Sequence, residues 1–363
     1  NQFSTIVERL PSAINLFRLL EARPALLAML ADILCHAPTL AEQLGQRPAM
    51  LDRLIDASAF DPPGSVDDIC GLLFGGETLE DTLDHVRRLV GEMRFALGVQ
   101  LVGGAQDALH VAGGYARIAE AAICVIADAT IAEFEKTHGR VPGGELVILA
   151  LGRMGGAELT HASDLDLIYL FTGDFAAASD GAKPLGAVHY FNRLSQRVTN
   201  GLSVPTAAGA LYDVDTRLRP SGNDGPLAIS LESFARYQRE NAWTWEHMAL
   251  TRARPVYGSP TAQAAAQTII TSVLTAPRDR AQMITDAAKM RSDMAAHKPP
   301  LGPLDVKLAS GGLVDLEFLT HVLQLAHGKG LTPSLGTAIA QLVAEGLMPS
   351  EMQQAHALLT RTL

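Results

Sequence analysis

The stretch LGRMGGAELTHASDLDLIYLF (Leu151–Phe171) decides the fold of the central part of the chain. Gly155 and Gly156 precede Asp164 and Asp166, which begin an otherwise apolar segment. A strand alternates its side chains between two faces, so the two aspartates point one way and the residues between and after them the other. Aspartate is depleted in strands and neighbouring like charges repel. The pattern therefore predicts a bound cation, and carboxylate oxygens suit Mg²⁺.

Length and composition bound the class of protein. The 363 residues are enough for two or three domains, and a hydrophobic share of 48% with only 5% aromatic residues is typical of a soluble, helix-rich globular protein. The chain begins with Asn1 instead of methionine and ends in AHALLTRTL, which resembles the middle of a helix. We therefore expect a fragment of a longer polypeptide.

Charge, cysteine content and hydropathy favour a cytoplasmic protein. The net charge of −10 disfavours non-specific binding to nucleic acid, which depends on Lys and Arg neutralising phosphates. Cys35, Cys70 and Cys124 lack the spacing of a metal site and are expected to be buried free thiols. No apolar run approaches the ~20 residues of a membrane span, and the start has no signal-peptide pattern. The sequence therefore predicts a cytoplasmic protein that binds neither nucleic acid nor membranes.

Periodicity predicts helices at both ends of the chain. Apolar residues recur at three- and four-residue steps through the first hundred residues, and a further helix is expected from Tyr115 to Thr137. The segment DASAFDPPGSVDD (Asp56–Asp68) is expected to be a linker. After Gly258 the pattern is helical to the end, except at HKPPLGP (His297–Pro303).

A different pattern lies between these helical parts. We expect strands at Glu145–Gly152, Asp164–Phe171 and Ala208–Pro220, because each is short and either apolar or alternating. A helix is expected at His189–Asn200, followed by one long amphipathic helix with residues from Phe234 to Met248 on a single stripe. The sequence therefore predicts an α+β fold, mostly helical, with a small mixed sheet between helical bundles.

A third carboxylate would complete a metal site. Asp213 and Asp215 share one face of the third predicted strand, and Arg217 and Arg219 continue that face. If this strand lies beside the second, three aspartates meet, and two Mg²⁺ ions roughly 3.5–4 Å apart would clamp the attacking and leaving oxygens of a phosphoryl group. The arginines would neutralise a leaving pyrophosphate, and the glycine pair leaves room for anionic phosphates. Together, in this order, these features indicate nucleotidyl transfer.

The order of the motifs resembles a known superfamily. A glycine pair followed by S-D-x-D on a strand, with a later third Asp, is similar to the nucleotidyltransferases that include polymerase β. More narrowly, Leu151–Phe171, YDVDTRLRP…RARPV (Tyr212–Val256) and DVKLASGGLVDLEF (Asp305–Phe318) resemble bacterial glutamine synthetase adenylyltransferase. In that family one domain adenylylates a tyrosine of glutamine synthetase, and a similar domain of the same chain removes the AMP by phosphorolysis. The AWTWEHMAL…RAR run (Ala242–Arg254) resembles the adenylylating, C-terminal copy.

The resemblance implies roles for individual residues. The catalytic metal ligands it implies are Asp164, Asp166 and Asp215, whereas Asp213 falls outside the match. It implies nucleotide binding by Gly155, Gly156, Ser163, Arg217 and Arg219. A further family motif, to which the sequence assigns no role, is matched by Lys307, Gly311, Gly312, Asp315 and Glu317.

The resemblance also implies a reaction and a domain organisation. The reaction is the Mg²⁺-dependent transfer of AMP from ATP to a tyrosine hydroxyl of glutamine synthetase, with release of pyrophosphate and regulation of nitrogen assimilation. The signalling protein PII is the implied regulator. The implied domains are a helical linker region (1–110), a polymerase-β-like nucleotidyltransferase domain (111–258) and a C-terminal helical domain (259–363).

Three alternatives to this function stay open. The phosphorolytic, deadenylylating copy would share every metal ligand. A nucleotidyltransferase could also act on a nucleic acid or a small molecule. A polynucleotide acceptor would need a basic groove leading into the site, and the acidic net charge disfavours it. A catalytically silent module would bind a nucleotide or a partner without turnover. The sequence contains neither GxxxxGK[ST] nor HExxH, which disfavours a P-loop NTPase and a zincin peptidase.

Simpler structural roles are the alternative for single residues. The paired aspartates would then face solvent on an edge strand, and the third aspartate would form surface ion pairs with the arginines. Core packing, and not stacking on adenine, is expected for Trp243, Trp245 and His247. An ion pair with Arg252 or Arg254 is expected for Glu246.

Overall fold

The structure is a computed structural model that describes residues 13–47, 50 and 61–363. These residues fall into two compact units, which are described separately. The first contains the chain up to Ala122 together with 206–211, and the second contains 123–205 and 212–363. The predicted α+β, mostly helical class is confirmed, because helices make up most of both units and the second contains a small mixed sheet.

The described residues of the first unit are mainly helical. Its helices are α2 (Ala13–Ala22), α3 (Pro24–His36), α4 (Pro38–Gln46), α6 (Val66–Leu73), α7 (Leu79–Val102) and the first part of α8 (Ala108–His138). Local sequence fixes two of the helix starts, since Ser65 with Asp68 and Thr78 with Asp81 each form a capping box. The predicted linker at 56–68 therefore ends at α6, and its residues 56–60 lie outside the described residues.

Helix α8 continues from the first unit into the second at Ala122–Ile123. By length and composition it is apolar enough to cross a membrane, so the expectation that no segment reaches that threshold is wrong. However, 67% of its most apolar window is buried, as in the core helix of a globular protein.

The sheet of the second unit is small and mixed. Its strands are β1 (Leu146–Ala150), β2 (Leu165–Phe171), β3 (Val214–Asp215), β4 (Ala228–Ser230) and β5 (Arg254–Tyr257). The order is β3-β2-β1-β5, with β1 antiparallel to β2 and β5. Both β3 and β4 run parallel to β2, the former at its beginning and the latter at its end. β2 is thus a central strand, which excludes the edge-strand alternative for the paired aspartates.

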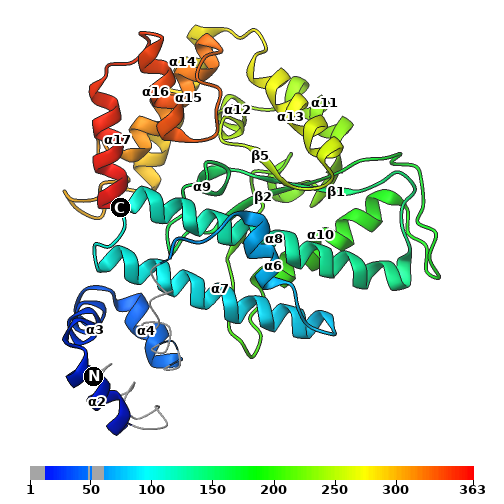
Figure 1. Ribbon diagram of the computed structural model, residues 1–363. Coiled ribbons are helices and arrows are strands. Elements are labelled where there is room, and N and C mark those ends of the chain that lie inside the picture. Colours follow the sequence, from blue (N-terminus) through cyan, green and yellow to red (C-terminus); the bar gives the residue numbers. More distant parts are fainter. Residues whose placement is uncertain (1–12, 48–49, 51–60) are drawn as a thin grey trace. The chain divides into compact units, whose positions relative to one another are not determined.

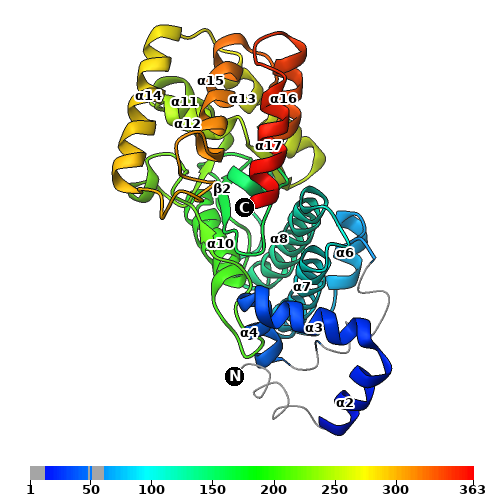
Figure 2. The same ribbon diagram turned by 90° about the vertical axis from the view of Figure 1, so that its left-hand side faces the viewer.

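Helices cover both faces of this sheet (Figures 1 and 2). On one face, Phe171 stacks on Phe191 of α10 (Ala187–Ser203), and the Tyr169 hydroxyl accepts a hydrogen bond from Thr199 of the same helix. On the other face, Ile168 and Leu170 belong to an apolar core shared with the helices that follow β4. Alternation therefore buries both sides of β2, as expected for a strand between two helical layers.

The helices after β4 form the second layer. They are α11 (Leu231–Glu240), α12 (Thr244–Leu250), α13 (Pro260–Leu274), α14 (Arg280–His297), α15 (Leu313–His327), α16 (Leu335–Ala344) and α17 (Glu351–Thr362). The single long helix predicted over α11 and α12 is wrong. The first helix ends at Glu240, with Asn241 as its C-cap. The Glu246 carboxylate accepts the backbone N–H of Trp243 at 2.9 Å, which starts a new helix.

The third predicted strand is much shorter than expected. Of Ala208–Pro220, only Val214–Asp215 pairs as a strand. The Asp215 carboxylate accepts the backbone N–H of Arg217 at 2.8 Å, and the N–H of Arg219 donates to the Thr216 carbonyl at 3.2 Å, so the chain turns there. β4 and β5 are strands that the sequence analysis did not predict.

Candidate active site

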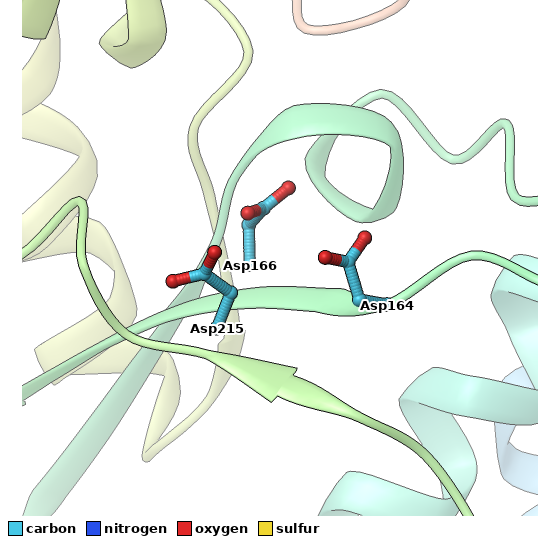
Figure 3. Close-up of side chains that lie close together, drawn as sticks. All are labelled: Asp164, Asp166 and Asp215. Carbon is cyan, nitrogen blue, oxygen red and sulfur yellow. The ribbon is translucent and has the colours of Figure 1, made fainter.

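Three aspartates from two neighbouring strands meet at the beginning of β2. Asp166 lies directly opposite Asp215 in the parallel β2–β3 pair, and the Leu165 N–H donates to the Asp213 carbonyl at 2.9 Å. Asp164, Asp166 and Asp215 each offer one carboxylate oxygen, and these oxygens lie within 4.8 Å of one another. Figure 3 shows the three carboxylates on the same side of the strands. The predicted meeting of these three residues is confirmed, whereas Asp213 is exposed and contributes only its backbone.

The negative charges of these three carboxylates favour binding of a cation. Burial, with a smaller contribution from the negative charges of Asp164 and Asp215, raises the pKa of Asp166 to about 6. The hydrogen bonds from Arg217 hold the pKa of Asp215 below its ordinary range. Three carboxylates at this separation are hard oxygen ligands of the kind that Mg²⁺ takes, so the residues fit a divalent metal site.

The two predicted arginines make different contacts. The Nε of Arg217 donates to both oxygens of Asp215, at 2.8 and 3.0 Å, although the Arg217 side chain is 72% exposed. The Nη1 of Arg219 donates to the carbonyl and the hydroxyl of Thr216, at 2.9 and 3.0 Å. The expected surface pairing of Asp215 is thus present with Arg217, while Arg219 braces the turn after β3.

Ser163 stabilises the turn that leads into β2. Its hydroxyl accepts the backbone N–H of Thr160 at 2.9 Å and shares a hydrogen bond with the Thr160 hydroxyl at 2.8 Å. Such a local bond fixes the approach of the chain to Asp164. Nucleotide binding by Ser163 stays a prediction.

Gly152 is a site residue that the sequence analysis missed. Its backbone has a φ of +53°, and a Cβ at this position would lie 2.1 Å from the Oδ2 of Asp166. Only glycine both adopts this conformation without strain and leaves room for the carboxylate. The available signal was a glycine directly after an apolar strand, which the sequence alone does not distinguish from the nearby pair Gly155 and Gly156.

Comparison with known proteins agrees with this arrangement of motifs. The family model for glutamate-ammonia ligase adenylyltransferase matches residues 27–269, about two thirds of the chain. This chain belongs to that family. The resemblance found in the sequence is therefore confirmed.

Relatives of this adenylyltransferase-family chain carry a double name. A bifunctional glutamine synthetase adenylyltransferase/adenylyl-removing enzyme of Agrobacterium fabrum is 42% identical over 360 residues, covering 96% of this chain and 36% of the relative. The enzyme of the same name from Rhizobium meliloti is 41% identical over 343 residues, covering 93% and 35%. The chain thus spans about a third of the length of the curated relatives it matches.

In this member of the adenylyltransferase family, the glycine pair accommodates a buried arginine. A Cβ on Gly155 would lie 1.8 Å from the carbonyl oxygen of Arg252, and a Cβ on Gly156 would lie 2.3 Å from its guanidinium. The side chain of Arg252 is only 6% exposed and pairs with Glu317 at 2.9 Å and Glu158 at 3.4 Å. The glycines therefore allow the segment after α12 to pack closely against the segment after β1.

Glu246 does not pair with Arg252, one of the two arginines that the sequence suggested. Its carboxylate caps α12, and the carboxylates that pair with Arg252 come from the segment after α9 (Gly152–Gly155) and from α15. The expected ion pair of Glu246 with Arg252 is therefore wrong. These true partners lie 94 and 65 residues away in the chain, beyond the reach of a local pattern.

A cavity of about 280 Å³ adjoins the aspartates on the side of the helical layer. Asp164, Asp166 and Arg153 line it from the sheet side, and Trp245 and Lys307 line it from the helical side. The core position expected for Trp243 is wrong, because that side chain is 70% exposed. His247 is partly buried and contacts the Gln238 carbonyl at 2.8 Å.

Proposed function

We propose that this chain catalyses Mg²⁺-dependent transfer of AMP from ATP to a tyrosine hydroxyl of glutamine synthetase, releasing pyrophosphate. The observation that carries the proposal is the cluster of Asp164, Asp166 and Asp215, whose oxygens lie within 4.8 Å at one end of the sheet. Membership of the adenylyltransferase family and the names of the relatives support the donor and the acceptor. The same membership favours control by PII in the cytoplasm.

The metal would be held by the three aspartates. Mg²⁺ bound there would polarise the α-phosphoryl group and favour ionisation of the acceptor hydroxyl. Arg217 is exposed apart from its bonds to Asp215, so it would turn from that carboxylate toward the leaving pyrophosphate. Asp215, once released, would accept the proton of the tyrosine hydroxyl, whose ordinary pKa is near ~10. Positioning of the two substrates would supply much of the rate enhancement.

The removal of AMP by phosphorolysis is the second candidate function. The relatives are named for both activities, and this chain covers only about a third of them. The same three aspartates would serve either reaction, because each breaks one P–O bond and forms another at the phosphorus of AMP. The AWTWEHMAL segment, by its resemblance to the adenylylating copy, favours transfer.

The test is to incubate the protein with α-labelled ATP, Mg²⁺ and unmodified glutamine synthetase, and to follow label on the synthetase by gel. We expect labelling that falls at least 100-fold in Asp164→Asn and Asp215→Asn. Asp213→Asn is the matched control, because Asp213 is exposed and lies outside the cluster, and it should retain activity.

Two other results would change the assignment. Release of ADP from pre-adenylylated synthetase in the presence of phosphate, without forward labelling, would identify the adenylyl-removing copy. Absence of both reactions in a folded protein would refute the proposed function.

A further inference from the structure

The cavity beside the aspartates has chemically distinct walls. Met290 of α14, Phe318 of α15 and Trp245 of α12 form an apolar, aromatic part. Asp164 and Asp166 line the cavity as well, so it opens directly onto the candidate metal site. Its volume of about 280 Å³ is near the lower end of small-molecule sites, and is large for a single phenol ring.

Lys307 brings a positive charge to this cavity on a braced loop. The Asp305 carboxylate accepts the backbone N–H groups of Lys307 at 3.1 Å, Leu308 at 3.0 Å and Leu301 at 3.1 Å. These bonds fix the segment between α14 and α15 at the point where Lys307 faces the cavity. Within residues 61–363, no carboxylate lies within 4.0 Å of the exposed Lys307 ammonium, so its charge is available to an anion.

The surface over the glycine pair offers less room. The space beside Gly155 and Gly156 is filled by the backbone and the guanidinium of Arg252. That guanidinium is in turn bound to Glu158 and Glu317. The cavity therefore offers a ligand both an apolar wall and the ammonium group of Lys307, whereas the surface over these glycines offers neither.

We propose that this cavity holds the nucleotide donor, with the base against Trp245, Met290 and Phe318 and the polyphosphate beside Lys307. Aromatic side chains stack on bases, and a lysine serves as a point charge for phosphate. The α-phosphate then lies toward Asp164 and Asp166. The inference rests on the proposed function, since it takes a nucleoside triphosphate as the donor, and it gives Lys307 the role that the sequence left unassigned.

The two tryptophans of the chain make a direct test. Trp245 lines the cavity, whereas Trp243 is 70% exposed and is not among the lining residues. Trp243→Phe leaves Trp245 as the only indole, and Trp245→Phe leaves Trp243. We expect Mg²⁺-ATP, added without glutamine synthetase, to change the emission of Trp243→Phe and to leave that of Trp245→Phe unchanged.

The role of Lys307 is tested by equilibrium dialysis with labelled ATP. Lys307→Ala should raise the Kd at least tenfold. Lys329→Ala is the control, because Lys329 is an exposed lysine of the same helical layer that pairs with Glu345 at 3.3 Å, and it should bind ATP normally. Circular dichroism of each variant checks that it is folded.

The outcomes separate this inference from the proposed function. Binding of ATP without a change in Trp245 emission, or with an unaltered Kd in Lys307→Ala, would place the nucleotide elsewhere and overturn the inference. A response of Trp245 to glutamine synthetase but not to ATP would identify the acceptor as the occupant, which also overturns it. ATP binding as expected without labelling of the synthetase would refute the proposed function alone.

Discussion

Replacing Gly152 by alanine should disable the site through one methyl group. The ideal Cβ would lie 2.1 Å from the Oδ2 of Asp166, whereas ordinary van der Waals contact begins at 3.4 Å. The Asp166 carboxylate must therefore move by about 1.3 Å, and a displacement of ~1 Å in a reacting group can cost about 100-fold in rate. We expect Gly152→Ala to lower the proposed AMP transfer to glutamine synthetase by about two orders of magnitude.

The substitution has a second effect that must be separated from the first. A residue with a side chain at a φ of +53° is strained by ~1–2 kcal/mol, partly offset by the reduced freedom of the unfolded chain. Gly143→Ala is the matched control, because its φ is +67° and its Cβ would have nothing within 4 Å. Both variants should lose about 1 kcal/mol in urea denaturation, but only Gly152→Ala should lose activity.

Binding of Mn²⁺, followed by electron paramagnetic resonance, gives a readout that needs no acceptor protein. Gly152→Ala should bind the ion at least tenfold more weakly than Gly143→Ala. If Gly152→Ala retains activity within about threefold of the parent, or if Gly143→Ala loses as much, the reasoning from the Cβ contact is refuted.

Two further predictions follow from the charges around the site. The pKa of Asp166 is about 6 in the folded state against an ordinary 3.8, so this carboxyl contributes stability that is full below pH 4 and lost as the pH rises through 6. The metal-free protein should therefore lose roughly 1–3 kcal/mol of unfolding free energy over that range, measured by urea denaturation at each pH. Asp166→Asn should abolish this pH dependence. A flat profile in the parent would contradict it. Arg252→Met should lower the free energy of unfolding by roughly 3–5 kcal/mol, because it leaves Glu158 and Glu317 without their partner. Lys136→Met is the control: it breaks an exposed pair with Glu133 and should cost less than ~1 kcal/mol. Equal losses in the two variants would contradict the argument from burial.

Local pattern was sufficient to place two of the three clustered aspartates. Period-two alternation puts Asp164 and Asp166 on one side at the beginning of β2, whereas the choice of Asp215 over Asp213 depended on the family resemblance of the TRLRP segment. These residues are close in sequence to the apolar runs that fix their direction, so period-two reasoning applies to them. Their meeting required only that β2 and β3 be neighbours.

The remainder depends on contacts between distant segments. The partners of Arg252 come from elements on both sides of it in the chain, and no periodicity relates them. Gly152 is required by its positive φ and by the close approach of the Asp166 carboxylate, 14 residues later in the chain. Neither can be predicted from the residues around it. β5 carries a proline and pairs with β1 through an irregular register, so its sequence does not resemble an ordinary strand.

The buried Arg252 has a consequence for how the molecule unfolds. It connects the segment after β1 to α15, and the residues on both sides of Gly258 belong to one compact unit. A shortened chain that stops before α13 would therefore expose a desolvated guanidinium and the apolar core that β2 shares with α13 and α14. In native-state hydrogen exchange, the amides of β1, β2 and α15 should open together as one cooperative segment, at a free energy close to that of global unfolding.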